Sequence, residues 1–121
     1  MVIGRDIYVS ILLPDESQFH ILAKVDTGAY SSSIDSDVFD RLNLIVNKVK
    51  TKTVKNVLGK EYRDIFPVEM LVKGFKIESE LNVFSRSDMK YKMIVGRKDI
   101  LKLNAVVDVR VKEKKNKKRK I

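Results

Sequence analysis

Hydrophobic and polar residues alternate along the first part of the chain with the period of a β-strand. Apolar side chains occupy every second position in residues 6–13 and again in residues 18–26. Because successive side chains of a strand point to opposite faces, both segments are predicted to be strands with one buried face. Residues 14–17, between them, are turn formers. We therefore expect a β-hairpin whose second strand ends at Asp26.

Short segments of the same kind continue through the rest of the chain. Strands are expected over residues 31–34, 62–72, 75–84, 91–95 and 105–111, and short helices over residues 37–43 and 97–103. Residues 45–57, rich in Lys, Thr and Val, are expected to be largely exposed. Pro67 predicts an edge or a bulge in its strand, since proline cannot donate to a sheet ladder. Short strands separated by turn residues are typical of a small β-barrel or sandwich. The sequence therefore predicts a mainly β fold with one or two short helices.

Charge divides the chain into two unequal parts. The net charge is +9, and residues 112–121 hold seven basic residues and one acidic residue, which is +6 of that total and leaves +3 for the rest. A block of like charges cannot bury enough apolar surface to fold. We expect one domain over residues 1–111 and a basic, disordered tail over residues 112–121. The tail is also predicted to make a weak contact with polyanions.

The composition excludes several kinds of chemistry. The chain has no cysteine and a single histidine, His20. Disulfides, thiol catalysis and a zinc site built from Cys and His are therefore excluded within one chain, and a cytoplasmic setting fits. No signal peptide and no membrane span is expected, because no apolar run approaches the roughly 20 residues that a spanning helix needs. We expect no metal, no cofactor and no membrane partner.

The segment from Val25 to Ala29 is the strongest candidate for a functional site. Asp26 follows an apolar strand and precedes Thr27, Gly28 and Ala29. A carboxylate at this point is held on rigid backbone and is still accessible to a ligand. The Thr27 hydroxyl can stabilise the turn, and Gly28 can allow close backbone approach or adopt positive φ. An ordinary Asp/Gly turn between strands is the alternative interpretation.

The second half of the chain contains a similar arrangement. Ile94 and Val95 end an apolar strand, Gly96 follows, and Arg97 begins the predicted helix. Two such loops that cross would place Asp26 beside a buried apolar hinge. Coincidence of two common turns is the alternative.

These motifs together resemble those of the retropepsin-like aspartic proteases. The shared features are Lys24-Val25-Asp26-Thr27-Gly28-Ala29, a hairpin around Gly59, and Met93-Ile94-Val95-Gly96-Arg97-Lys98-Asp99-Ile100-Leu101. The resemblance covers roughly residues 5–110. The run from Ser85 to Arg97 is most similar to a bacterial and archaeal branch often labelled ATP-dependent zinc proteases. The composition supports neither zinc nor ATP in that label, since Cys and a Gly-rich phosphate loop are absent.

The resemblance implies a small closed acid-protease barrel and a peptide-cleaving homodimer. Aspartic proteolysis needs two carboxyl groups, so each subunit would contribute Asp26 to a dyad that activates water. Thr27, Gly28 and Ala29 would support this loop. The resemblance also implies a flap at Leu58, Gly59 and Lys60 that folds over an extended peptide, and a second hinge loop at Ile94, Val95, Gly96 and Arg97.

Two other functions remain open at this point. The same fold could bind peptides or dimerise without efficient catalysis, with Asp26 in a structural role. A β-barrel that binds RNA or DNA through its lysines and tail is the third hypothesis. It lacks the exposed aromatic residues on which single-stranded bases stack.

Overall fold

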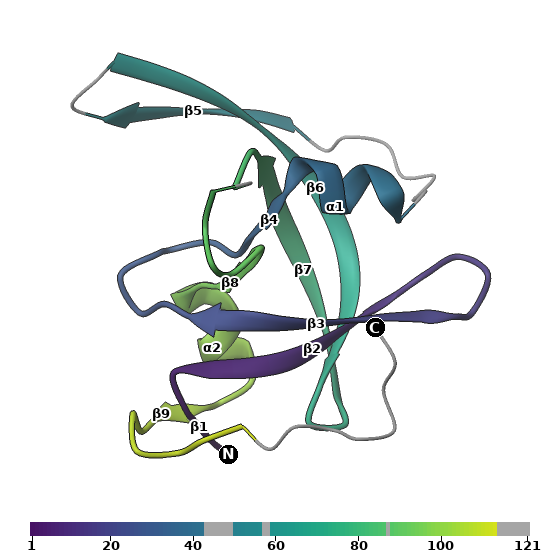
Figure 1. Ribbon diagram of the computed structural model, residues 1–121, viewed down its shortest axis with the longest axis vertical. Coiled ribbons are helices and arrows are strands. Elements are labelled where there is room, and N and C mark those ends of the chain that lie inside the picture. Colours follow the sequence, from purple (N-terminus) through teal and green to yellow (C-terminus); the bar gives the residue numbers. More distant parts are fainter. Residues whose placement is uncertain (43–49, 57–58, 87, 114–121) are drawn as a thin grey trace.

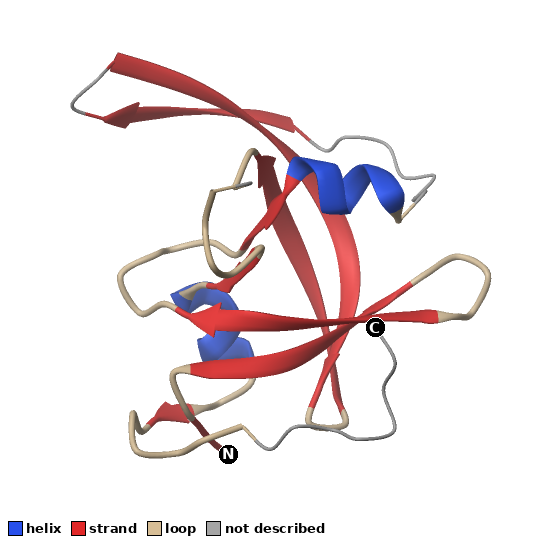
Figure 2. Ribbon diagram, viewed as in Figure 1, coloured by secondary structure: helices blue, strands red, loops and turns tan. Residues whose placement is uncertain are grey.

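A closed barrel of six strands is the centre of the fold (Figures 1 and 2). The computed structural model describes residues 1–42, 50–56, 59–86 and 88–113, and the side chains of those outside residues 50–62. The barrel strands are β2 (Asp6–Leu12), β3 (Gln18–Val25), β8 (Met93–Val95), β4 (Ser33–Asp35), β7 (Phe75–Phe84) and β6 (Gly59–Val72), in spatial order. An additional pairing of β6 with β2 closes the barrel. The predicted mainly β fold is confirmed.

The predicted hairpin is formed by β2 and β3, which pair antiparallel from Asp6↔Lys24 to Leu12↔Gln18. The alternation of the sequence determines which face is inside. Ile7, Val9 and Ile11 are completely buried. Burying an aliphatic side chain of this size stabilises the folded state by about 1.5–3 kcal/mol. The hairpin therefore contributes one wall of the core and delivers Asp26 at the end of β3.

The long strand β6 changes its partners along its length. It pairs with β7 from Asp64 to Val72, with β5 (Lys50–Asn56) over its first half, and with β2 at Met70 and Leu71. Pro67 falls between the segments paired to β5 and to β2, where β6 has β7 as its neighbour. The missing N–H of proline costs little there, as predicted. The hairpin of β5 and β6 extends beyond the barrel on the side where β3 ends (Figure 1).

Two short helices lie close to the predicted positions. Helix α1 spans Ser36–Arg41, and the Asp35 carboxylate caps it by accepting from the Val38 N–H at 3.3 Å. Helix α2 spans Arg97–Lys102 and follows Gly96. The helix thus begins one residue before the predicted range, because the Asp35 side chain satisfies an N–H group of its first turn.

The ends of the chain differ from the prediction. The strand expected over residues 105–111 is confined to β9 (Val106–Val107), which pairs in parallel with β1 (Val2–Ile3), a strand that was not predicted. Phe75 begins β7 as expected but is 61% exposed, because it lies at the hairpin turn beyond the core. Residues 43–49, 57–58 and 114–121 lie outside the described residues. They include the last residue of the first predicted helix, part of the predicted flap and most of the predicted tail.

Candidate functional site

The position of Asp26 is determined by its neighbour strand. Strands β3 and β8 run parallel, with Val25 in register with Val95. The ladder continues for one more bond, in which the Asp26 N–H donates to the Val95 carbonyl at 3.0 Å. Val25 and Val95 are buried and Asp26 is half-buried. The backbone of Asp26 is therefore held by the sheet while its side chain remains accessible.

The turn after Asp26 orients the carboxylate. The Gly28 N–H donates to Asp26 Oδ1 at 2.9 Å, and the Ala29 N–H donates to the Asp26 carbonyl at 3.2 Å. Gly28 does not adopt positive φ. A Cβ atom at Gly28 would lie 3.2 Å from Asp26 Oδ1. Glycine at this position therefore leaves room for the carboxylate to lie close to the backbone. Thr27 and Gly28 are exposed.

The two loops that the sequence relates do cross. The Arg97 N–H donates to the Ala29 carbonyl at 2.8 Å, and the Lys98 N–H donates to the Tyr30 carbonyl at 3.0 Å. A Cβ atom on Gly96 would stand 2.6 Å from the carbonyl carbon and oxygen of Ser31. No side chain can occupy that space without moving backbone. Gly96 therefore permits the contact between the hinge loop and the Asp26 loop.

A buried hydrogen-bond network lies under this crossing. The carboxylate of Asp99, in the first turn of α2, accepts from Ser32 Oγ at 2.5 Å and from Ser79 Oγ at 2.6 Å. Ser32 Oγ in turn accepts from the Gly96 N–H at 3.0 Å. All three polar side chains are buried. The network ties the Asp26 loop, the hinge loop and β7 together.

Arg97 lies on the exposed side of the crossing. Its Nη1 donates to the Thr27 carbonyl at 2.9 Å, and its guanidinium lies 5.8 Å from the centre of the Tyr30 ring. Tyr30 is 58% exposed. Arg97 thus supports the Asp26 loop from outside and leaves an aromatic side chain in solvent beside it.

A second arginine, Arg86, acts on the site from within. Arg86 is buried, and burial together with the nearby charge of Arg63 lowers the pKa of its guanidinium, while the charges of Asp26 and Asp35 oppose this shift. The Asp35 carboxylate accepts from the Arg86 backbone N–H at 2.7 Å, and this bond is the main cause of its lowered pKa. Arg86 thus joins the end of β7 to the start of α1 through the Asp35 carboxylate.

The predicted flap is described in part. Gly59 and Lys60 begin β6 and pair with Asn56 and Lys55 of β5, whereas Leu58 lies outside the described residues. The predicted hinge residues Ile94, Val95 and Gly96 are all buried.

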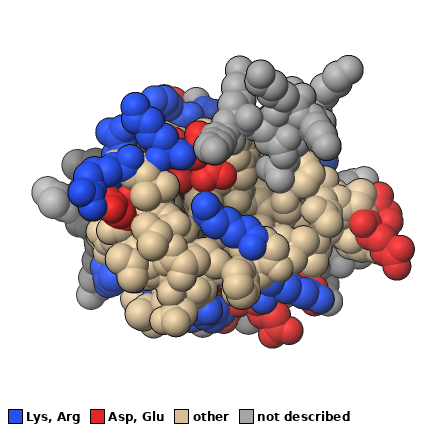
Figure 3. All heavy atoms as spheres, turned by 90° about the horizontal axis from the view of Figure 1, so that it is seen from below, with Lys and Arg blue, Asp and Glu red and all other residues tan. Residues whose placement is uncertain are grey.

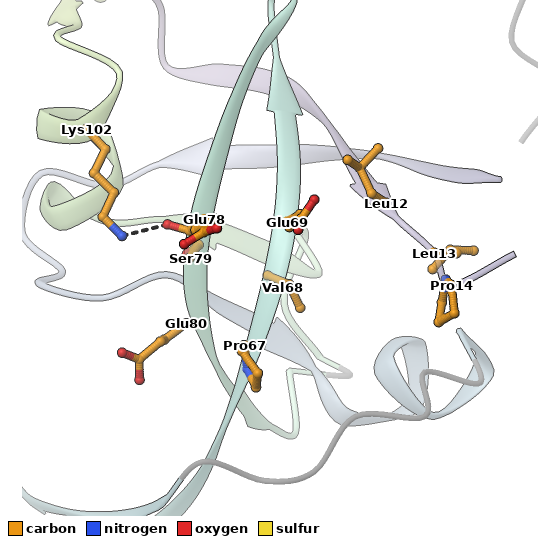
Figure 4. A pocket seen from close by; sticks show the side chains of 10 residues that line it. All are labelled: Leu12, Leu13, Pro14, Pro67, Val68, Glu69, Glu78, Ser79, Glu80 and Lys102. Carbon is orange, nitrogen blue, oxygen red and sulfur yellow. Dashed lines mark hydrogen bonds between the residues drawn. The ribbon is translucent and has the colours of Figure 1, made fainter. Parts of the chain in front are cut away.

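A cavity of about 680 Å³ lies elsewhere on the barrel, beside the part of β6 that pairs with β7 alone. Figure 4 shows its lining side chains, which come from the β2 end of the first hairpin, from β6 and β7, and from α2. Lys102 Nζ donates there to the Glu78 carbonyl at 2.6 Å. None of its lining residues belongs to the Asp26 loop or the hinge loop. This cavity and the candidate catalytic residue are therefore separate features.

One face of the molecule is largely uncharged. Figure 3 shows a broad uncharged area on the face that carries β1 and β9, with most of the visible Lys and Arg side chains around it. Val2 and Val106 of these strands are exposed.

Across the described residues, no cluster of three or more His, Cys, Asp or Glu side chains could hold a metal ion. None of the described helices is long and apolar enough to cross a membrane.

Sequence reasoning missed three residues that shape the site. Ser32 and Asp99 form the buried network, and Arg86 supplies a buried charge. Arg86 belonged to a motif that had been recognised, which could have indicated it. Asp99 lay in the motif from Met93 to Leu101, whereas for Ser32 the signal was its position shortly after the Asp26 loop.

The geometry supplies one accessible carboxylate on a rigid loop per chain. Such a group can accept or donate a proton, and hydrolysis of a peptide bond requires a second group to perform the complementary transfer.

Comparisons with known proteins support the fold. No family model matches the chain, and no curated protein matches it. Among solved structures, the EIAV protease in complex with the inhibitor HBY-793 is similar, with a TM-score of 0.64 and 23% identity over 86% of this chain and 91% of that one. The simian foamy virus (mac) protease has a TM-score of 0.57 and 19% identity over 82% and 94% of the two chains.

A Legionella pneumophila protein of unknown function (DUF785) is also similar, with a TM-score of 0.62 and 17% identity over 91% of this chain and 94% of that chain. The fold is therefore retropepsin-like. At these identities the likeness concerns the fold alone.

Proposed function

We propose that this protein is an aspartic endopeptidase that works as a homodimer, with Asp26 of each subunit forming the catalytic dyad. The observation that carries the proposal is the placement of Asp26. Its backbone is held by β8, its carboxylate is oriented by the Gly28 N–H, and its loop is exposed on a retropepsin-like barrel. A rigid, accessible carboxylate is the group that water activation requires.

Dimerisation follows from the chemistry, because one chain contributes a single Asp-Thr-Gly motif. A two-fold axis near Asp26 would bring two identical loops together. The exposed ring of Tyr30 beside that loop and the exposed Val2 and Val106 offer apolar surface for such an interface. This exposure supports the proposal, since burial of apolar surface drives association.

The reaction would then need two opposite proton transfers. Two carboxyl groups at close range share one proton, because both cannot ionise together. The ionised Asp26 would take a proton from water as the water attacks the peptide carbonyl. The protonated Asp26 of the other subunit would give its proton to the carbonyl oxygen, which forms a tetrahedral diol. As the C–N bond breaks, the first Asp26 would give its proton to the leaving nitrogen and the second would take one back from a diol hydroxyl, which restores the dyad. The hairpin of β5 and β6, with Gly59 and Lys60, would cover the extended peptide and add strand hydrogen bonds.

The decisive experiment compares the parent protein with Asp26→Asn. The amide keeps the shape of the side chain but cannot act as a base, and a symmetric dimer changes both copies at once. We expect hydrolysis of a peptide library to fall by at least about 10²–10⁴. Asp15→Asn is the matched control, because Asp15 lies in the turn at the opposite end of β3. Binding of pepstatin by the parent is a second readout.

Each outcome has a definite meaning. If Asp26→Asn hydrolyses peptides as fast as the parent, the site is wrong. If the parent binds peptides but cleaves none, the fold serves as a peptide-binding or dimerisation module, as the second hypothesis holds. We also propose a cytoplasmic setting, which the absence of cysteine supports.

A further inference from the structure

We propose that Ser32 and Asp99 are positioning residues of the proposed protease, because they hold the loop that carries Asp26 (residues 26–32) against the start of α2. Neither side chain would touch the substrate, and both would act through the backbone of this loop. The inference rests on the proposed function and names the residues that fix the place of its catalytic group.

The first turn of α2 is capped by the Asp26 loop. The first N–H groups of a helix have no acceptor within the helix and must find one elsewhere. The Arg97 N–H donates to the Ala29 carbonyl at 2.8 Å, and the Lys98 N–H donates to the Tyr30 carbonyl at 3.0 Å. The end of β3 and the start of α2 accordingly lie close together in Figure 1. The loop therefore supplies acceptors that the first turn of the helix needs.

The N-cap residue of α2 has no capping side chain of its own. That residue is Gly96, and a Cβ atom on it would lie 2.6 Å from backbone atoms of Ser31. The loop thus occupies the space in which a capping side chain would stand. In a capping box, an acidic side chain three residues into the helix accepts from the N-cap N–H. Here Ser32 Oγ lies between the two groups, since it accepts from the Gly96 N–H at 3.0 Å and donates to Asp99 Oδ2 at 2.5 Å.

Asp99 determines the orientation of the Ser32 hydroxyl. A serine hydroxyl has one proton to donate, whereas a carboxylate oxygen only accepts. Because the Ser32 proton is directed at Asp99, the lone pairs of Ser32 Oγ are left for the Gly96 N–H. Asp99 is 2% and Ser32 is 1% exposed, so water has little access to these bonds. Asp99 therefore sets the direction of the hydrogen bonds, and Ser32 transmits it to the loop.

The anchor at Ser32 fixes the end of the loop that lies away from Asp26. At the other end, the Asp26 N–H donates to the Val95 carbonyl at 3.0 Å. With both ends held, the Asp26 carboxylate has a defined place in its subunit, which the pairing with a second Asp26 requires. A displacement of about 1 Å can lower the rate of an enzymatic reaction by about 10²-fold. Loss of the anchor should therefore slow the chemical step more than it weakens peptide binding.

Ser79 offers a matched control for Ser32. Its Oγ donates to the same oxygen of Asp99 at 2.6 Å, and the residue is 4% exposed. Ser79 belongs to β7, so its hydroxyl joins Asp99 to that strand rather than to the Asp26 loop. Ser32→Ala and Ser79→Ala each remove one buried hydroxyl from Asp99. We therefore expect the two variants to lower the melting temperature by similar amounts and to differ in activity.

The first experiment compares these variants in the full-length protein. We expect kcat for peptide hydrolysis to fall by about 10²-fold in Ser32→Ala, with KM changed by less than about threefold. In Ser79→Ala, kcat should stay within about threefold of the parent value. Equal losses of kcat in the two variants, or an unchanged kcat in Ser32→Ala, would overturn the inference.

Two substitutions test Asp99 in the same assay. Asp99→Asn keeps an oxygen that can accept from both serine hydroxyls, so it should retain more activity than Asp99→Ala. The loss in Asp99→Ala should appear in kcat, as in Ser32→Ala. An Asp99→Ala variant that cleaves peptides like the parent would contradict the role of the carboxylate.

Hydrogen exchange gives a readout that does not depend on cleavage. In the parent, the amide protons of Gly96, Arg97 and Lys98 should exchange with the same opening free energy as that of Ala29, because the loop and the start of α2 open together. In Ser32→Ala all four should exchange about tenfold or more faster, whereas Ser79→Ala should leave them within about threefold of the parent. Different opening free energies in the parent would overturn the inference, even if Ser32→Ala does not fold.

Failure of this inference is distinguishable from failure of the proposed function. If the parent cleaves no peptide but the exchange rates respond to Ser32→Ala as expected, the endopeptidase is refuted and the anchor of the Asp26 loop stands. If the parent cleaves peptides and the exchange rates do not respond to Ser32→Ala, the endopeptidase stands and the positioning role is overturned.

Discussion

The backbone N–H of Asp26 donates to the carbonyl of Val95 at 3.0 Å, although the two residues belong to different halves of the chain. This bond extends the parallel pairing of β3 with β8 by one residue beyond Val25. The pairing of β3 with β8 therefore fixes the position of the Asp26 backbone nitrogen. The β8 strand and the hinge after it support the site as much as the Asp-Thr-Gly turn does.

Gly96→Ala tests the crossing of the two loops. The added Cβ would lie 2.6 Å from backbone atoms of Ser31 and 3.0 Å from the Ala29 carbonyl oxygen. Because backbone must move, we expect the free energy of unfolding to fall by about 1–3 kcal/mol. We also expect peptide hydrolysis to fall, since the Asp26 loop shifts. Urea denaturation and a hydrolysis assay measure both effects.

The control for this change is Gly74→Asn, in the turn between β6 and β7. Gly74 has φ +81° and nothing within 4 Å of a Cβ atom, and asparagine tolerates this backbone conformation. We expect a loss of less than about 1 kcal/mol and unchanged hydrolysis. Equal losses at Gly74 and Gly96 would contradict the argument from close approach.

Acid stability should depend on Asp35. The Arg86 N–H lowers the pKa of this buried carboxyl in the folded state. A depressed folded pKa stabilises the protein above the unfolded value of about 3.9, and that stabilisation is lost as the pH falls through the folded pKa. We therefore expect the melting temperature of the parent to exceed that of Asp35→Asn at pH 7, and the difference to shrink toward pH 3.

Asp15→Asn is the control for the pH experiment. The pKa of Asp15 is also lowered, by hydrogen bonds from Ser17, but Asp15 is exposed. Because solvent screens an exposed charge, Asp15→Asn should change the melting temperature less than Asp35→Asn does. If the difference in melting temperature between the parent and Asp35→Asn stays constant from pH 7 to pH 3, the Asp35 charge does not contribute to stability.

The dyad requires that two chains associate. Analytical ultracentrifugation over a wide concentration range, with and without pepstatin, should show a dimer that the inhibitor strengthens, because a ligand shared by two subunits binds only the assembled form. A protein that stays monomeric at every concentration, with the inhibitor present, would exclude the dyad mechanism.

The basic tail can be tested by deletion. Removing residues 112–121 lowers the net charge from +9 to +3, since the segment contributes +6. We expect weaker binding to single-stranded DNA and a flatter dependence of that binding on salt, because fewer counterions are released. Folding and peptide cleavage should change little.

A variant with serine at each basic position of residues 112–121 is the matched control, because it keeps the length of the chain. If the deletion unfolds the protein or dissociates a dimer while the serine variant does not, the segment has a structural role.

The local part of the fold could be predicted from the sequence. Alternation with period two identified β2, β3, β6 and β7 because burial on one strand face depends only on neighbouring residues. The same reasoning placed Asp26 at the end of β3. It did not find β1 and made β9 too long, and each of these strands has two residues. Two residues are too few for a period, and these strands exist because distant ends of the chain pair.

What the sequence determined is thus the longer elements and the residue at the end of β3, since both follow from local chemistry. Only the tertiary structure decided that Gly96 lies against Ser31, that Asp99 joins Ser32 and Ser79, and that the Arg86 N–H donates to the Asp35 carboxylate. These contacts join segments that closure of the barrel brings together. Their energies depend on distance and burial, and neither quantity is written in the spacing of residues along the chain.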